Sequence, residues 1–343
     1  MIRADANSQL GTGHVMRCLG LAHAWQDRGG RVGYLLAAPA AEIRARLDAE
    51  DVDVFDLPCP PGGLQDAAAT ACLAQNQHAA WIVVDGYQFG GDYQRAIHEA
   101  AVPLLVLDDY GHADHYWADL VLNQDLNAEE QLYRSRESYT RLLLGPEYVL
   151  LRREFVAARR KEHRPKAHSR KVLVTLGGAD PENLTRTVIE ALAGLGGLAV
   201  ESRVVVGPAN PRYGELEAAA AHAGPHVEVL RNVRNMVELM SWCDIAITGG
   251  GSTLWELASL CVPSLVLILA DNQRYSARLL EQRGGCRIVG EGAWLSAGAL
   301  SEQIAALLAD QSQQAALGQR IGAIVDGRGA QRVCEAMEGA DRL

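Results

Sequence analysis

The sequence has few aromatic residues, no paired cysteine motif and no apolar run long enough to cross a bilayer. Phe, Trp and Tyr make up 6% of the 343 residues, and the apolar fraction consists mainly of Ala, Leu, Val and Gly. This composition favours packed helices and buried strands over an all-β sandwich. The seven cysteines are odd in number and widely spaced, which indicates neither a zinc site nor a disulfide framework. The longest apolar stretches have the length of a strand, so no membrane partner is expected.

Positive charge is also scarce. The formal net charge is −10, and an acidic chain repels nucleic acid, so no nucleic-acid partner is expected. Basic residues cluster only at 152–153 and 159–164, where a solvated linker or helix face explains them better than a polyanion site. No signal peptide precedes Arg3 and Asp5, so the expected location is the cytoplasm.

A chain of 343 residues exceeds the usual size of one core and predicts two domains. Short β-branched runs alternate with helical stretches along the whole chain. The runs lack in–out alternation, as is typical of strands buried on both faces of a parallel sheet. The predicted fold class is α/β, with two Rossmann-like domains facing a cleft. The predicted strands are 80–84, 102–107, 119–122, 171–176, 202–206, 227–230, 244–248 and 263–268.

The domain boundary is expected after Gly145 and Pro146, which break the chain. A charged stretch without apolar periodicity follows, and it contains Pro165, which is typical of an exposed linker. We therefore expect an N-terminal domain at 1–150, a linker at 151–167, a second domain at 168–325 and a C-terminal tail at 326–343.

The first of three glycine-rich turns places Gly11 and Gly13 just ahead of His14 and a helical stretch at 15–25. Glycine lets the backbone approach a ligand closely, and a helix N-terminus offers N–H groups to an anion. His14 lies on the turn itself, where a side chain can point into a cleft. The pattern is short, however, and these residues alone favour a structural or surface histidine.

The second turn contains Gly177 and Gly178 after an apolar strand. Asp180 can cap the next helix and Pro181 suits the first helical position. A well-capped helix start explains this turn as well as phosphate contact from the two glycines does.

The third turn carries three consecutive glycines, and it is the more specific signal for phosphate. Gly250 and Gly251 lie between a buried strand and a helix, where glycine costs stability. Ser252 and Thr253 add hydroxyl donors. Glu256 has two interpretations: it completes a capping box with Thr253, or it accepts hydrogen bonds from ribose hydroxyls.

Two common nucleotide-binding classes do not fit these turns. None of the turns continues into the G-K-[ST] of a Walker A loop. The first turn also lacks the last glycine of a dinucleotide fingerprint, because Arg17 lies three residues after His14. ATPase and NAD dehydrogenase functions are therefore disfavoured.

The C-terminal half resembles the nucleotide-binding half of GT-B glycosyltransferases such as the UDP-N-acetylglucosamine transferase of peptidoglycan synthesis. The resemblance rests on the stretch 229–236, the glycine turn with Glu256, and the sequence ADNQ at 270–273. It implies that backbone groups near Val233 and Met236 hold uracil and that Glu256 holds the ribose. The diphosphate would lie on Gly250, Gly251, Ser252 and Thr253, and Asn272 and Gln273 would reach the sugar.

The N-terminal half narrows the resemblance. The sequences RADAN at 3–7, GTGHVMR at 11–17, VDGY at 84–87, LDDY at 107–110 and LGPEY at 144–148 occur in this order. Together with GGGSTLWE at 249–256, they are similar to the UDP-2,4-diacetamido-2,4,6-trideoxy-β-L-altropyranose hydrolases of pseudaminic acid biosynthesis. The resemblance implies that His14 is catalytic and that Tyr87 faces the substrate. Arg17 would face the cleft or lie on the surface.

The resemblance also implies a reaction. Water attacks the anomeric carbon and UDP leaves, with inversion and without a cofactor or metal. The partners are the UDP-sugar and UDP, and a monomer is expected. The product would serve nonulosonic acid synthesis for flagellin glycosylation or a surface polysaccharide. The C-terminal tail would pack on the first domain, as in two-domain glycosyltransferases.

Three alternative functions and two structural expectations stay open at this point. The alternatives are a GT-B glycosyltransferase using a UDP-amino sugar, a UDP-sugar 2-epimerase and a non-catalytic nucleotide-sugar binding protein. Asp108 and Asp109 are expected in a turn or a helix cap. The first strand is very short, because Arg3 follows Met1 and Ile2 directly, and this leaves the edge of the first sheet uncertain.

Overall fold

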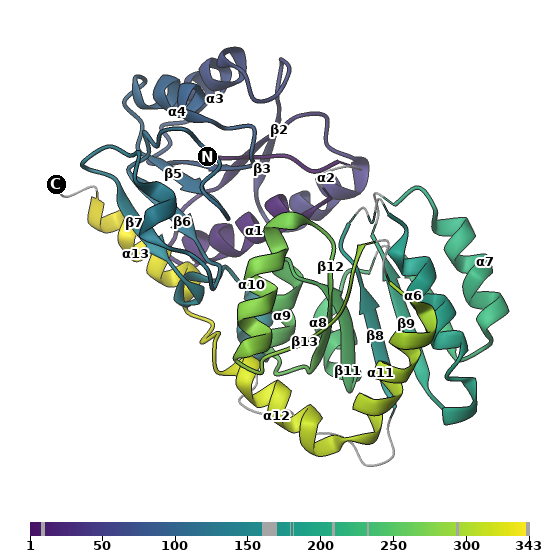
Figure 1. Ribbon diagram of the computed structural model, residues 1–343. Helices are drawn as coiled ribbons and strands as arrows, with labels where there is room; N and C mark the ends of the chain where they lie inside the picture. Colours follow the sequence, from purple (N-terminus) through teal and green to yellow (C-terminus); the bar gives the residue numbers. More distant parts are fainter. Residues whose placement is uncertain are drawn as a thin grey trace. The chain divides into compact units, whose positions relative to one another are not determined.

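The computed structural model describes residues 1–7, 11–159, 170–178, 180, 182–207, 210–231, 233–292 and 295–340. The chain forms two compact units (Figure 1). Unit 1 comprises Met1–Asn7, His14–Arg153 and the C-terminal stretch from Arg328. Unit 2 comprises Glu154–Gly327 and the short stretch before His14.

In the described part of unit 1, seven parallel strands form one sheet in the order β3-β2-β1-β4-β5-β6-β7. The short β1 pairs with both β2 and β4, so it lies inside the sheet and the edges are β3 and β7. The concern that a short first strand leaves the sheet edge uncertain was therefore wrong. The strands are β1 (Ile2–Ala4), β2 (Gly33–Leu36), β3 (Asp53–Asp56), β4 (Ile82–Asp85), β5 (Leu104–Leu107), β6 (Leu120–Asn123) and β7 (Arg141–Leu144).

Helices cover both faces of this sheet. Val83 and Leu105 belong to a core with α1, α2 and the C-terminal α13, whereas Val84 and Val106 belong to a second core with α3 and α4. This division follows from the alternation of side chains along a strand, and it explains why the strand sequences are continuously apolar. The helices are α1 (Gly13–Gln26), α2 (Ala41–Asp48), α3 (Leu64–Asn76), α4 (Gly91–His98), α13 (Gly329–Ala340) and the 3-10 turns η1 (Glu130–Tyr133) and η2 (Pro146–Tyr148).

Within the described residues of unit 2, six parallel strands form a sheet in the order β10-β9-β8-β11-β12-β13. The strands are β8 (Lys171–Thr175), β9 (Glu201–Val206), β10 (Val227–Arg231), β11 (Ile245–Gly249), β12 (Ser264–Ile268) and β13 (Arg287–Glu291). The helices are α5 (Arg153–Ala158), α6 (Leu184–Ala193), η3 (Gly196–Leu198), α7 (Tyr213–Ala223), α8 (Met236–Trp242), α9 (Ser252–Ser259), α10 (Asp271–Gln282), α11 (Ala297–Ala309) and α12 (Gln311–Gly322).

The stretch expected as a linker is partly helical. α5 occupies Arg153–Ala158, and its residue Phe155 is completely buried. This part of the expected linker is therefore not an exposed stretch. Residues 160–169, including Pro165, lie outside the described residues.

Both sheets reverse their strand order at one place, between β1 and β4 in unit 1 and between β8 and β11 in unit 2. Loops that leave neighbouring strands in opposite directions open a crevice at the carboxyl ends, which is where ligands bind in open α/β sheets. In unit 1 these are the loops after Ala4 and Asp85. In unit 2 they are the glycine turns after Thr175 and Gly249.

No helix in the described ranges is long and apolar enough to cross a membrane.

Candidate functional site

The pair of His14 and Asp85 lies at the reversal point of unit 1. α1 begins at Gly13, which puts His14 in its first turn, and Asp85 is the last residue of β4. His14 Nδ1 lies 2.6 Å from Asp85 Oδ1. The described residues give the ring no other hydrogen bond, and its side chain is 12% exposed. Such a contact through Nδ1 orients the ring and leaves Nε2 for chemistry.

Asp85 is a buried carboxylate held by a guanidinium. Arg17 donates from Nε to Oδ2 at 2.6 Å and from Nη2 to Oδ1 at 2.7 Å. Burial alone would raise the pKa of Asp85, but the charge of Arg17 and the bonds from Arg17 and His14 hold it well below its usual range. Asp85 is therefore ionised at neutral pH and accepts the Nδ1–H of His14, which leaves Nε2 as the basic nitrogen in the neutral ring.

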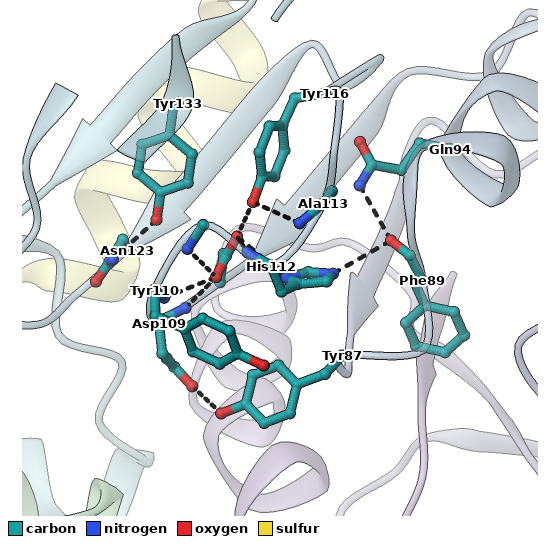
Figure 2. Close-up of polar contacts among 12 residues, drawn as sticks. Tyr87, Phe89, Gln94, Asp109, Tyr110, His112, Ala113, Tyr116, Asn123 and Tyr133 are labelled. Carbon is teal, nitrogen blue, oxygen red and sulfur yellow. Dashed lines mark hydrogen bonds and ion pairs between the residues drawn. The ribbon is translucent and has the colours of Figure 1, made fainter. Parts of the chain in front are cut away.

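Arg17 extends this network to Asp109 and Tyr87. Its Nη1 donates to Asp109 Oδ1 at 2.6 Å, and the Tyr87 hydroxyl donates to Asp109 Oδ2 at 2.5 Å, as Figure 2 shows for the latter pair. The Arg17 side chain is only 9% exposed, so the surface interpretation of Arg17 was wrong. The Tyr87 ring lies edge-on to the His14 ring, with centroids 5.3 Å apart.

Asp108 and Asp109 have different roles although they are adjacent. Asp108 Oδ1 accepts the backbone N–H groups of Asp109, Tyr110 and Gly111 at 2.5, 2.9 and 3.0 Å. Its expected role in a turn is confirmed. Asp109 instead accepts from Arg17 and Tyr87, so the expectation of a turn or cap role was wrong for this residue.

The carboxylate of Asp108 also contacts a histidine and a tyrosine. Oδ2 lies 3.1 Å from His112 Nδ1 and accepts from the Tyr116 hydroxyl. Burial would raise the pKa of Asp108, but the hydrogen bond and charge of His112 outweigh it and bring that pKa to about 2. Burial likewise opposes the charge on His112, yet Asp108 raises its pKa. This pair fixes the loop that carries Asp109 and Tyr110.

Asp5, which also follows a strand at the reversal point, has structural partners. It accepts from Arg3 at 2.6 Å, from the backbone N–H of Ala37 at 2.8 Å and from Gln88 at 3.2 Å. Arg3 is fully buried and also pairs with Asp66 at 2.9 Å. These contacts tie the loop after β1 to its neighbours, and they distinguish Asp5 from Asp85.

In unit 2 the third glycine turn leads into a helix without a side-chain cap. α9 begins at Ser252, and its N-cap is Gly251. A capping box needs a side-chain acceptor at the N-cap, so the capping-box interpretation of Thr253 and Glu256 was wrong. A helix start without a side-chain cap has backbone N–H groups that can bind an anion.

Gln273 supports this turn. Its Oε1 accepts from the backbone N–H of Gly250 at 3.1 Å and of Leu269 at 3.2 Å. A Cβ on Gly250 would lie 3.1 Å from the Gln273 Cβ, so the close approach of α10 to the turn depends on glycine. Asn272 precedes Gln273 in the first turn of α10.

The second glycine turn is different, because a carboxylate already occupies the helix start beside it. Asp180 accepts from the N–H groups of Leu184 and Thr185, both at 2.9 Å. α6 begins at Leu184 rather than directly after Asp180, and Pro181 lies outside the described residues. Gly177 has φ +86°, which accounts for glycine there by the turn alone. A phosphate at α6 would meet the negative charge of Asp180.

Val233 lies between β10 and α8. Met236 is the first residue of α8, and Asn235 caps this helix by accepting from the N–H of Glu238 at 3.1 Å. Asn232 lies outside the described residues. In the described residues, no three His, Cys, Asp or Glu side chains gather in a way that could hold a metal ion.

Sequence reasoning did not assign Asp85 or Asp109 to the site. The available signal was their position, since Asp85 is the last residue of the apolar strand β4 and Asp109 lies two residues after the end of β5. Position alone did not distinguish them from Asp5 or Asp108, which also follow strands.

Comparison with known proteins places these features in context. Residues 171–324 match the family model of the glycosyltransferase family 28 C-terminal domain. The chain is 28% identical over 200 residues to the spore coat polysaccharide biosynthesis protein SpsG of Bacillus subtilis, covering 58% of each chain. It is 23% identical over 288 residues to the UDP-2,4-diacetamido-2,4,6-trideoxy-beta-L-altropyranose hydrolase of Campylobacter jejuni, covering 83% of this chain and 96% of that protein.

The similarity does not extend over the whole of every relative. The chain spans 58% of the Bacillus protein and 56% of an uncharacterised protein of Methanocaldococcus jannaschii, to which it is 25% identical over 279 residues.

The fold is shared with solved structures. MurG of Acinetobacter baumannii has a TM-score of 0.65 at 16% identity, covering 98% of this chain and 99% of that chain. S. aureus MnaA, solved with UDP, has a TM-score of 0.67 at 14% identity, covering 100% and 97%. The predicted fold class, α/β with two Rossmann-like units of the GT-B type, is confirmed. The part of unit 2 at 171–324 is similar to the glycosyltransferase family 28 C-terminal domain.

Proposed function

We propose that this protein hydrolyses a UDP-sugar, and that its substrate is UDP-2,4-diacetamido-2,4,6-trideoxy-β-L-altropyranose in pseudaminic acid biosynthesis. The observation that carries the proposal is the His14–Asp85 pair. An ionised, buried carboxylate holds Nδ1 at 2.6 Å, and Nε2 remains as a base at the crevice of unit 1. The Campylobacter relative carries the name of this hydrolase.

The uncapped start of α9 supports binding of the UDP moiety. The N–H groups of its first turn and the hydroxyls of Ser252 and Thr253 bind the diphosphate and stabilise it as a leaving group. Glu256, one helical turn further along α9, accepts from the ribose hydroxyls. Backbone groups of Val233 and Met236 hold uracil.

Asn272 and Gln273 bind the sugar. Because Gln273 Oε1 is engaged by Gly250 and Leu269, its amide N–H₂ is the part directed to the ligand. Gly177 and Gly178 have a lesser role, because Asp180 neutralises the start of α6.

The chemical step needs one base and one leaving group. His14 Nε2 takes a proton from water as the water oxygen bonds to the anomeric carbon. The bond from that carbon to the diphosphate oxygen breaks, and UDP leaves with the bonding electrons. Attack opposite the leaving group inverts the anomeric carbon. The imidazolium that forms is stabilised by Asp85, and such a base contributes about 10²–10⁴-fold.

Arg17 and Tyr87 prepare this base. Arg17 forms ion pairs with Asp85 and Asp109 inside the unit, and its charge keeps Asp85 ionised. Burial and the charge of Asp109 raise the pKa of Tyr87 far above neutrality, so Tyr87 remains a protonated donor beside His14. In this proposal Tyr87 faces the sugar.

The test is incubation of the protein with the UDP-sugar and no acceptor, followed by ¹H and ³¹P NMR. A hydrolase releases UDP and free sugar. The anomeric proton signal of the free sugar that appears first shows whether the configuration at the anomeric carbon has inverted. An unchanged UDP-sugar contradicts the proposal, and a UDP-sugar with altered configuration at C2 would indicate a 2-epimerase instead. A sample without protein controls for spontaneous hydrolysis.

A glycosyltransferase that uses a UDP-amino sugar is the second candidate. The match of residues 171–324 to the glycosyltransferase family 28 C-terminal domain favours it, because that family is named for glycosyl transfer. The acceptor-free incubation separates the two functions, since a transferase leaves the UDP-sugar nearly intact.

A further inference from the structure

We infer that Tyr110 determines sugar specificity, and that it favours UDP-sugars bearing methyl groups, as acetamido or 6-deoxy substituents, over fully hydroxylated ones. The inference rests on the proposed function, because it takes the crevice around His14 as the place where the sugar binds. It assigns a role to a residue that takes no part in the chemical step.

Tyr110 is an exposed aromatic residue that is connected to His14 through the ring of Tyr87. The residue is 43% exposed. Its ring centroid lies 5.0 Å from that of Tyr87, at an interplanar angle of 50°, and Tyr87 in turn lies edge-on to His14. Figure 2 shows the Tyr110 and Tyr87 rings next to each other, with His112 above them in this view. The rings of Tyr87, Tyr110 and His112 are in mutual contact and form one aromatic wall at the carboxyl end of the sheet.

The exposed ring is carried by a rigid turn. The backbone N–H of Tyr110 donates to Asp108 Oδ1 at 2.9 Å, as do the N–H groups of both neighbours. Gly111 has φ +77°, and a Cβ there would lie 2.7 Å from the Leu132 carbonyl oxygen. The backbone of Tyr110 is thus fixed before any ligand arrives, so binding does not have to order it.

An aromatic face of this kind discriminates between methyl and hydroxyl groups. A methyl group gains from leaving water and contacting the ring. A hydroxyl group placed against the same face loses its water partners and finds no acceptor or donor there. In the described structure the Tyr110 hydroxyl makes no hydrogen bond, which points to the ring rather than the hydroxyl as the functional part.

The test is a set of calorimetric titrations with UDP, UDP-glucose, UDP-N-acetylglucosamine and UDP-N-acetyl-6-deoxyglucosamine. All are made in the His14→Ala background, so that no ligand is consumed. We expect affinity to rise along the three UDP-sugars as methyl groups are added. Adding Tyr110→Ala should weaken binding of the two methyl-bearing sugars by about tenfold and leave UDP and UDP-glucose unchanged. Tyr110→Phe should keep the original affinities.

Tyr139→Ala is the matched control. Tyr139 belongs to the same unit and is 41% exposed, but its ring stacks on His98 and it lies two residues before the start of β7. Its loss should change none of the four affinities. The inference is overturned if Tyr110→Ala binds all four ligands like its parent, if it loses UDP to the same extent, or if the parent itself does not discriminate between the UDP-sugars. Because the readout is binding, absence of hydrolysis in the NMR assay contradicts the proposed function and not this inference.

Discussion

Asp85 is the residue on which the network of unit 1 converges. It accepts from His14 and Arg17, and its side chain is fully buried. The fixed carboxylate sets which nitrogen of His14 carries the proton, a role that a neutral amide cannot fill in the same way.

Asp85→Asn is therefore expected to lower kcat by about 10²–10⁴-fold. The affinity for UDP should stay unchanged, because the diphosphate is assigned to unit 2. Steady-state release of UDP and calorimetric titration with UDP measure the two quantities. Turnover within a few fold of wild type would show that the carboxylate does not prepare His14.

Asp108 predicts a dependence of stability on pH. Its pKa is about 2 in the folded protein against an ordinary value of 3.8. A lowered pKa stabilises the fold above the ordinary value, and this stabilisation is lost as the pH falls from about 4 towards 2. Asp108→Asn should lower the free energy of unfolding by about 2 kcal/mol at neutral pH.

Urea denaturation of both proteins, followed by tryptophan fluorescence, measures this difference at several pH values. The gap between wild type and Asp108→Asn should narrow as the pH falls below about 4. A gap that is constant over this range would mean that the charge on Asp108 does not contribute.

The sequence pointed to His14 as the proposed base only through the family resemblance, and it did not single out Asp85 as its partner. His14 stands on a glycine turn at a helix start, which is a local pattern. Asp85 is 71 positions away, and it reaches His14 because β4 pairs with β1. Strand order is a property of the whole sheet, so no local pattern of residues distinguishes Asp85 from Asp5.

At the scale of elements, the starts of α6 and α9 show how similar sequences acquire different roles. Both helices follow a glycine turn after a central strand. At the start of α6, the carboxylate of Asp180 accepts hydrogen bonds from the backbone N–H groups of Leu184 and Thr185. By contrast, α9 has glycine at its N-cap and no side-chain cap. The positive end of α9 is thus the one that remains for a phosphate.

Ser252→Ala tests this assignment. Ser252 is not a cap, so its loss should leave the thermal midpoint unchanged and weaken UDP binding by about tenfold through one lost hydrogen bond to a charged group. Calorimetry with UDP and thermal unfolding measure both effects.

Ser296→Ala provides the opposite case. Ser296 caps α11 by accepting from the N–H of Ala299 at 3.4 Å. Its loss should cost about 1 kcal/mol of stability and leave UDP binding unchanged. If Ser252→Ala instead lowers stability and spares UDP affinity, the diphosphate does not bind at α9.

The strands predicted from sequence are those with continuous apolar runs. All eight correspond to strands of the structure, namely β4, β5, β6 and β8 to β12. The strands that were not predicted include β3, β7 and β13, which lie at sheet edges. Edge strands have a neighbour on one side only and carry more polar residues, as in the sequence DVFD of β3. The correlation is partial, because the edge strand β10 was predicted and the interior strand β2 was not.

At the scale of the whole molecule, the ends of the chain meet in one unit. α13 buries Val333 and Cys334 in the same core as Leu19 of α1, so unit 1 is completed by residues from both ends of the sequence (Figure 1). The repeated βα pattern of the sequence indicated two α/β units, but the return of α13 follows from tertiary packing and not from periodicity.

The division of labour between the units is the central claim: unit 2 binds UDP and unit 1 supplies the base. The most direct measurement compares His14→Ala with wild type for UDP affinity by calorimetry and for UDP release without an acceptor. We predict unchanged UDP affinity and a loss of turnover of about 10²-fold or more. Near-normal turnover in His14→Ala would contradict the account.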